Sequence, residues 1–407
     1  MKILLRNLSW PIYFIILFGV QNLTNWWALS VSGIRGGNFI DLGAVFRWSD
    51  CFKTIGTSVY GLEEGKCGGY LYGSALLRIF NFLGIRESQT QFWGLFGGLV
   101  LAICLGLLAK VFISTKKISA LFVGLAFSSP GFWLLVERGN IDELIFILLL
   151  LASFLFIRGF EIPVVLIIAI TALFKFYTAP LLLLLVIVAK KNKLRVLSLA
   201  TFFLVVPLVL FDYLRIKASF PNTWFVSFGS PAIGFWVNLF GEKFGQDWVH
   251  LGAISGHILG LVILIFSIFA VNKFVNMEKQ FQFPPRNSNN SSQVDVILLI
   301  FGSVFVVCYV LGMNYDYRLI LAAISGVALI LRNLESPYSL LIKVSLILGL
   351  WFSSFSFGIQ NDPSIETVTL FVLIQFVGDI ALGIFTAFLS LQLIKFVSQF
   401  ITDRNRI

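Results

Sequence analysis

The chain has 407 residues, of which 58% are apolar and only 12% carry a charge. A soluble domain typically has about 25% charged residues, so this composition excludes a soluble enzyme, a disordered chain and a small disulfide-built domain. The formal net charge is +10, but the basic residues form no run with interleaved aromatic residues, so we expect no nucleic-acid binding. The composition predicts an all-α, polytopic membrane protein whose basic residues gather in cytoplasmic loops.

The apolar stretches predict the membrane-spanning helices. A spanning helix needs about 20 mainly apolar residues. The first stretch follows Lys2 and Arg6 and has no small-residue cleavage site, so we expect it to remain as a helix instead of being removed as a signal peptide. Taken in chain order, the predicted spans are Leu8–Ala28, Phe92–Phe112, Ile118–Val136, Ile141–Ile157, Leu194–Leu214, Leu251–Val271, Val294–Met313, Leu319–Leu331, Ser339–Phe357 and Thr367–Leu389.

The stretch from Ile162 to Ala189 has a different character. It is longer than one span and too short for two, and Lys175 and Pro180 interrupt it. Basic residues flank both of its ends. It therefore predicts a hairpin of two short half-helices with the break at Lys175–Pro180, which is tolerated at membrane depth only against protein or a water-filled cavity. The whole chain, residues 1–407, is then a single domain of about 12 membrane segments, the broken hairpin included.

The basic residues of the short loops set the predicted orientation. With the spans above they all fall on one side, which the positive-inside rule makes cytoplasmic. Both termini are then cytoplasmic, in a multi-pass protein of the plasma (inner) membrane. Two long loops, residues 30–91 and 215–250, are extracytoplasmic, and the polar segment 280–293, which contains paired prolines, is a cytoplasmic linker.

Four polar elements reach the same extracytoplasmic face. Three are compact sequences at span boundaries, Asn38–Asp41, Glu137–Asp142 and Asn314–Arg318, and the fourth is the hairpin tip at Lys175–Thr178. Interfacial ion pairs or a tight Gly-Asn turn would explain each sequence taken alone. A lysine inside an apolar run is costly, however, and indicates a function. The convergence of all four elements, rather than any one of them, predicts a site.

Three further features carry weaker signals. Cys51 and Cys67 share the first long loop, where an oxidising compartment permits a disulfide; the sequence is compatible both with a bridge and with two free thiols. His250 and His257 have no Cys or acid at ligand spacing, so we expect no metal site. Asp379 lies inside the last span without an obvious partner and is interpreted as structural.

The order of the motifs resembles a known family. An Asp follows the first span, an Arg138-Gly-Asn140 turn comes next, and the broken hairpin carries Lys175-Phe-Tyr-Thr-Ala-Pro180. This order resembles the membrane glycosyltransferases of the GT-C fold, especially glycosyltransferase family 87, which includes polyprenol-phosphate-mannose-dependent α-mannosyltransferases. The resemblance is topological over most of the chain and sharp only in these motifs. Where many members have Tyr-Pro-Pro in the first loop, this chain has Gly69-Tyr-Leu-Tyr-Gly73.

The resemblance implies transfer of a sugar from a donor that is anchored in membrane lipid. A polyprenyl-phosphate sugar donor would pass a mannose-like hexose to an extracytoplasmic glycan or glycolipid acceptor, without a cofactor. Asp41 matches the family's catalytic Asp and would act as the general base, with Asp50 as the second choice. Cations and tyrosines would stabilise the departing phosphate. The predicted donor-binding residues are Arg138, Asn140, Asp142, Lys175, Tyr177, Tyr315, Asp316 and Arg318.

Two other functions are compatible with the sequence. A transporter or flippase for a lipid-linked sugar also uses broken helices with a buried charge. Such charges usually lie near the membrane midplane in repeated halves, and no repeat is visible here. A polymerase or ligase of surface glycans would take lipid-diphosphate oligosaccharides, and only the family-like motifs argue against it. No Gly-rich phosphate cradle is present, which disfavours direct use of a nucleotide sugar.

Overall fold

The computed structural model describes residues 10–20, 39–60, 67, 69–114, 118–189, 191–215, 227–230, 232, 236–237, 253–277, 289–311, 314–315, 318–353 and 365–404. Within these residues the fold is helical, apart from one pair of two-residue strands, as the all-α prediction requires. A helix at Trp10–Val20 comes first. The elements that follow are α3 (Ile40–Ile55), η1 (Gly56–Tyr60), α4 (Ser74–Phe82), η2 (Glu87–Gln89), α5 (Thr90–Ser114), α6 (Ala120–Phe127), α7 (Pro130–Arg138), α8 (Asp142–Ile157), α9 (Glu161–Phe174), η3 (Phe176–Thr178), α10 (Pro180–Val188), α11 (Asn192–Tyr213), β1 (Ser227–Phe228), α13 (Ala253–Met277), α14 (Asn289–Leu311), β2 (Asn314–Tyr315), α15 (Leu319–Arg332), α16 (Ser339–Phe352) and α17 (Ile365–Arg404).

Five of the described helices are long and apolar enough to cross a membrane, and a bent helix pair makes a sixth if it is counted as one span. Many large apolar side chains point outward from these helices: Phe96 on α5, Phe203 on α11 and Phe266 on α13 are all more than half exposed. Exposed apolar surface on this scale fits a lipid environment. The protein is therefore a multi-pass helical membrane protein. The five spans are Glu87–Ile113, Asn192–Tyr213, Ser255–Lys273, Gln293–Leu311 and Leu373–Gln399.

The remaining predicted spans correspond to shorter helices. Helix α8 has 16 residues and α15 and α16 have 14 each, which is about 24 Å and 21 Å of helix against a hydrocarbon core of about 30 Å. The structure thus supports five or six spans, and the count of about 12 segments remains a prediction. The predicted break in the hairpin is present, because α9 ends at Phe174 and α10 begins at Pro180.

The predicted span Ile118–Val136 is not one straight helix. It divides into α6 and α7, which are bent by 45° at the break between them. Pro130 occupies the first turn of α7 and Ser129 precedes it. Proline has no N–H to donate and its ring clashes with the preceding turn, so a helix that reaches a proline tends to end and restart there. The last predicted span is also longer than expected, since α17 continues to Arg404.

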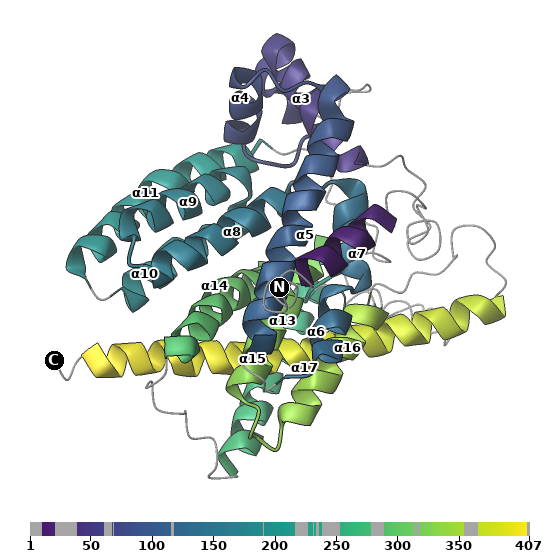
Figure 1. Ribbon diagram of the computed structural model, residues 1–407, viewed down its shortest axis with the longest axis vertical. Coiled ribbons are helices and arrows are strands. Elements are labelled where there is room, and N and C mark those ends of the chain that lie inside the picture. Colours follow the sequence, from purple (N-terminus) through teal and green to yellow (C-terminus); the bar gives the residue numbers. More distant parts are fainter. Residues whose placement is uncertain are drawn as a thin grey trace, which may run out of the picture.

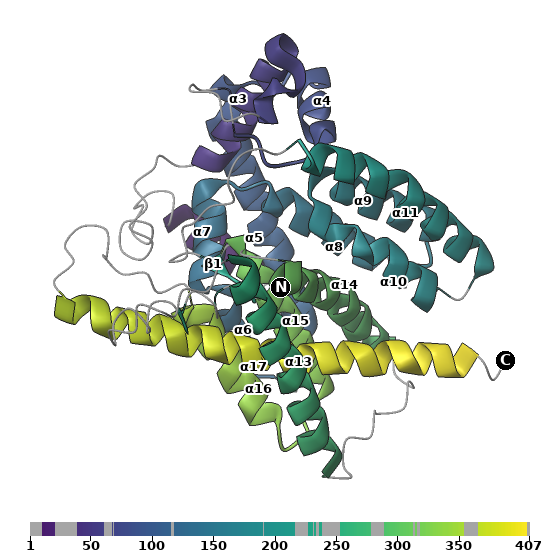
Figure 2. The same cartoon turned by 180° about the vertical axis from the view of Figure 1, so that it is seen from behind.

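Helices α8, α9, α10 and α11 lie side by side as one group, with α14 packed against it (Figure 1). Seen from behind, α17 crosses the molecule beside α13 and α16 (Figure 2). A single apolar core runs through these helices, from Phe14 near the start to Phe396 in α17. Because α8 to α11 alternate in direction, the ends that carry Asp142, Lys175 and Asp212 lie together.

The opposite ends of these helices, and the corresponding end of α15, carry basic residues. Arg158 follows α8, Lys191 precedes α11 and pairs with Glu161 at 3.4 Å, and Arg332 ends α15 and pairs with Asp295. The group therefore has one end rich in site residues and one end rich in cations. This separation agrees with the charge pattern that predicted a cytoplasmic face.

The first loop forms a small unit of α3, η1 and α4 with its own apolar cluster, at one end of the molecule (Figure 1). Cys51 and Cys67 are joined by a disulfide with a Cα–Cα distance of 5.7 Å, which resolves the alternative that the sequence left open. The unit docks on the hairpin at Gly73, whose N–H donates to Phe174 O at 3.1 Å. A Cβ at Gly73 would lie 1.7 Å from Leu173 O, so only glycine allows this approach.

Three contacts anchor the described part of the second long loop. Trp236 Nε1 donates to Asp379 Oδ2 at 2.8 Å, so Asp379, for which the sequence showed no obvious partner, has one. Ser230 Oγ lies 3.0 Å from His257 Nδ1. Strands β1 and β2 then pair the loop with the segment before α15, with Ser227 opposite Tyr315. These contacts join the second loop to α13, to α17 and to the segment between α14 and α15.

Candidate functional site

Asp41 is positioned by an unusual backbone conformation just before it. Phe39 has φ 62° and ψ 32°, and it is the only described residue other than glycine with a positive φ. Its ring packs so closely on Gly94 and Gly139 that a Cβ at either would collide with it. The Phe39 N–H donates to Glu137 O at 2.6 Å. A residue other than glycine whose backbone is held in this left-handed conformation costs about 1–3 kcal/mol, and such strained residues tend to cluster at functional sites.

Arg138 and Asn140 hold the Asp41 carboxylate. Arg138 Nε donates to Asp41 Oδ1 at 3.0 Å and to Oδ2 at 2.9 Å, and Nη2 donates to Oδ1 at 2.5 Å. Asn140 Nδ2 donates to Oδ2 at 2.7 Å. Gly139 makes this geometry possible, because it ends α7 in the left-handed conformation with φ 57°. The Arg-Gly-Asn sequence is therefore both a tight turn and a source of two donors.

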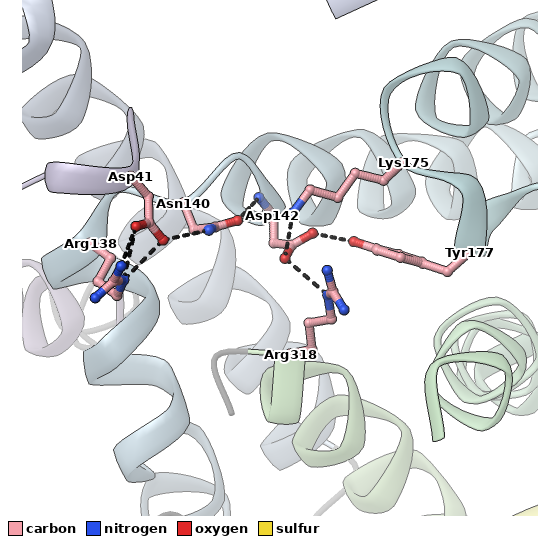
Figure 3. Close-up of polar contacts among 7 residues, drawn as sticks. All are labelled: Asp41, Arg138, Asn140, Asp142, Lys175, Tyr177 and Arg318. Atoms are coloured by element: carbon pink, nitrogen blue, oxygen red, sulfur yellow. Dashed lines mark hydrogen bonds and ion pairs between the residues drawn. The ribbon is translucent and has the colours of Figure 1, made fainter. Parts of the chain in front are cut away.

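Asn140 links this carboxylate to Lys175 and to the start of α8. Its side-chain oxygen accepts from Lys175 Nζ at 3.0 Å and from the Asp142 N–H at 3.1 Å. Both groups are donors, which assigns the amide oxygen to that side and the amide nitrogen to Asp41. One side chain thus connects the Asp41 carboxylate to the Asp142 backbone and to Lys175, which in turn pairs with the Asp142 carboxylate, as Figure 3 shows.

Asp142 is the centre of the deeper half of the network. Its carboxylate lies 2.9 Å from Lys175 Nζ and 3.2 Å from Arg318 Nε, and it accepts a hydrogen bond from the Tyr177 hydroxyl. Arg318 also lies over the Tyr177 ring, 4.8 Å from its centroid. Asp142 begins α8, where the helix dipole favours an anion. The contacts come from α8, the hairpin tip and the start of α15 (Figure 3).

The network changes from accessible to buried along its length. The side chains of Arg138 and Asp41 are 23% and 16% exposed and that of Arg318 is 15% exposed. Asp142 and Lys175 fall to 5% and 2%. A ligand therefore meets Asp41 and the two arginines first. Among these five side chains the three cations outnumber the two carboxylates by one.

Tyr72 belongs to the site although the sequence analysis did not select it. Lys175 Nζ lies 4.3 Å from the centroid of its ring, a cation–π geometry. Burial raises the pKa of the Tyr72 phenol, and the charges of Asp41 and Asp142 raise it further, so the ring stays neutral. Tyr72 sits in the Gly69–Gly73 segment. Its place beside Lys175 depends on the docking of the first loop on α9, for which local spacing gives no signal.

Of the other predicted residues, one is described in full and lies apart from this network, and two have side chains that are not described. Asp50 lies on α3 nine residues after Asp41, about 13 Å along the axis and half a turn out of phase, so it faces away from Arg138. The fallback role as base therefore loses its geometric support. The backbone of Tyr315 pairs with Ser227 in the strand ladder, but its side chain and Asp316 lie outside the described residues.

Glu143, the residue after Asp142, is buried without a counter-charge. Its Oε1 has no hydrogen-bond partner within the described ranges, and its Oε2 lies 3.0 Å from where a Cβ on Gly97 would sit. The described residues contain no group of three or more His, Cys, Asp or Glu side chains able to hold a metal ion. The network is thus an arrangement of ion pairs with one accessible end.

No known family model, no curated protein and no solved structure matches this chain. The resemblance to the GT-C glycosyltransferases accordingly remains a prediction that depends on the Asp41, Arg138–Asn140 and Lys175–Pro180 motifs.

Proposed function

We propose that this chain is a membrane glycosyltransferase that passes a mannose-like hexose from a polyprenyl-phosphate donor to an extracytoplasmic glycan or lipid acceptor. The observation that carries the proposal is the joining of Asp41 to Arg138, Asn140, Lys175 and Asp142 in one network. These residues come from three sequence motifs that resemble one family. A phosphodiester donor has one negative charge, which matches the single excess positive charge among these five side chains of the network.

In the proposed reaction the acceptor hydroxyl gives its proton to Asp41 as its oxygen attacks the anomeric carbon. The bond from that carbon to the phosphate oxygen breaks, and the polyprenyl phosphate leaves with the electron pair. Attack from the side opposite the leaving group inverts the anomeric configuration. Arg138 and Arg318, the two accessible cations, stabilise the charge that grows on the phosphate.

Lys175 and Tyr177 have a supporting role in this proposal. The Lys175 ammonium is already directed at Asp142, Asn140 and the Tyr72 ring, and the Tyr177 hydroxyl donates to Asp142. With these contacts in place, Lys175 and Tyr177 orient the residues beside the donor instead of binding the phosphate directly. The buried Lys175 ammonium also adds positive potential beneath the donor site.

The orientation forms part of the same proposal. The network faces the extracytoplasmic side, both termini are cytoplasmic, and the shorter helices complete about 12 segments of a GT-C-like bundle in the plasma (inner) membrane. The Cys51–Cys67 bridge supports this orientation, because disulfides persist in oxidising compartments. The cations at the far ends of α8, α11 and α15 support it independently.

A transporter or flippase for a lipid-linked sugar is the competing function. The break between α9 and α10 beside a buried lysine favours it. Against it, the charges of the network lie where helices begin or end, and no repeated halves are visible in the sequence.

Transfer of radiolabelled sugar tests the proposal. Membranes that contain the wild type, Asp41→Asn or Asp50→Asn are given synthetic polyprenyl-phosphate mannose, glucose or arabinose. We expect the wild type and Asp50→Asn to label endogenous lipid or glycan, and Asp41→Asn to be slower by at least about 100-fold, the usual contribution of a general base. No transfer from any donor by folded wild-type protein would refute the proposal and favour transport.

A further inference from the structure

Both oxygens of the Asp41 carboxylate already accept hydrogen bonds from two donor atoms each. A carboxylate has about four lone-pair positions, two on each oxygen. Oδ1 accepts from Arg138 Nε and Nη2, and Oδ2 accepts from Arg138 Nε and Asn140 Nδ2, over distances of 2.5 to 3.0 Å. A base in this state is engaged by three N–H groups, which compete with the proton of an acceptor hydroxyl.

Three of these four contacts come from Arg138, two of them from its single Nε–H, which is shared between both oxygens. Its guanidinium is a planar fork that suits a carboxylate and a phosphate equally well. It is also the most exposed charged side chain of the network, at 23%, so an arriving anion can reach it. Asn140, in contrast, is held on its other side by Lys175 and by the Asp142 N–H. Arg138 is therefore the partner that can leave.

We infer that the phosphate of the donor activates Asp41 by competing for Arg138. When Arg138 turns to the phosphate, the carboxylate keeps the Asn140 hydrogen bond, which orients it, and regains free acceptor positions. The donor must then bind before the acceptor hydroxyl can engage its base. The inference rests on the proposed function and adds an order of binding and a resting state in which Asp41 is blocked.

The inference makes a reciprocal thermodynamic prediction. If Asp41 and the phosphate compete for Arg138, then removal of the Asp41 charge must tighten phosphate binding. Charge-assisted hydrogen bonds of this kind correspond to roughly a ten- to hundredfold change in affinity. The tightening must disappear when Arg138 is absent, because Asp41 and the phosphate then have no shared partner to compete for. Repulsion through space between Asp41 and the phosphate would persist without Arg138.

A double-mutant cycle separates these two cases. Binding of dodecyl phosphate, a single-chain alkyl phosphate, is measured by calorimetry with protein in lipid nanodiscs; dodecanol and empty nanodiscs serve as the uncharged and protein-free controls. We expect Asp41→Asn to tighten binding at least about tenfold in the Arg138 background and to leave it unchanged within about twofold in the Arg138→Gln background. Asp50→Asn, the same charge removal on the same helix, should leave binding unchanged.

Equal tightening in both backgrounds, or no tightening in either, would overturn the inference. Failure of the wild type to bind dodecyl phosphate while it still transfers sugar would overturn it as well. Failure of sugar transfer itself is a separate result and refutes the proposed function. If Arg138→Gln does not fold, Arg138→Lys replaces it: one ammonium cannot form the fork, so the tightening caused by Asp41→Asn should shrink by at least about threefold.

Discussion

Replacement of Asp142 by Asn is expected to destabilise the protein strongly. The substitution keeps the shape of the side chain but removes the carboxylate that lies 2.9 Å from Lys175 Nζ and 3.2 Å from Arg318 Nε. Lys175 is only 2% exposed, so its charge would remain buried without a counter-ion. Removing one partner of a buried ion pair typically costs about 3–5 kcal/mol. We expect about 3 kcal/mol, near the lower end, because the amide oxygen can still accept one hydrogen bond.

A second substitution isolates the cause of this loss. Lys175→Met in the Asp142→Asn background removes the uncompensated charge and keeps an unbranched apolar chain. We expect the double variant to regain at least about 1 kcal/mol relative to Asp142→Asn alone, since residues in direct contact couple by about 0.5–3 kcal/mol. A double variant that is less stable than either single variant would contradict the argument.

The assay is equilibrium unfolding in mixed micelles by titration with dodecyl sulfate, followed by far-ultraviolet circular dichroism. Glu87→Gln provides the matched control, because it breaks an exposed ion pair with Arg47. The Arg47 and Glu87 side chains are 36% and 47% exposed. Exposed pairs contribute about 1 kcal/mol or less. If Asp142→Asn lowers the free energy of unfolding no more than Glu87→Gln does, the buried network has no special role in stability.

Three further predictions concern the first loop. Gly73→Ala places a Cβ 1.7 Å from a backbone carbonyl oxygen of α9; we expect lower thermal stability and slower sugar transfer, and an unchanged melting temperature would contradict the docking contact. Reduction of the Cys51–Cys67 bridge should lower the free energy of unfolding by about 3 kcal/mol in the chain-entropy model, as measured by unfolding with and without reductant and with Cys51→Ser as the matched variant. Tyr72→Leu removes the ring beside Lys175 while it keeps an apolar side chain; a cation–π contact that excludes water contributes about 2 kcal/mol, and a change below about 0.5 kcal/mol would show that the ring does not stabilise the ammonium.

The sequence alone determined the class of the protein and the locations of its polar motifs. The scarcity of charge required a membrane environment, because a helix packed in water needs a polar face. The break in the hairpin was predictable as well, since Pro180 and a lysine cannot continue an apolar helix without cost. Asp41, Arg138 and Asp142 could be chosen because each stands at the end of an apolar stretch, where a membrane protein places its polar residues.

Only the tertiary structure decided which of these residues are partners. Arg138 pairs with Asp41 rather than Asp50 through contacts 97 residues apart in the chain, and Asp379 meets Trp236 across 143 residues. Such pairs depend on how the helices cross and rotate, which a linear pattern of apolar and polar residues leaves open. The same applies to Tyr72: its ring reaches Lys175 because the first loop docks on the end of α9. Local chemistry selects which residues can ionise or break a helix, and helix packing then determines which charges neutralise one another.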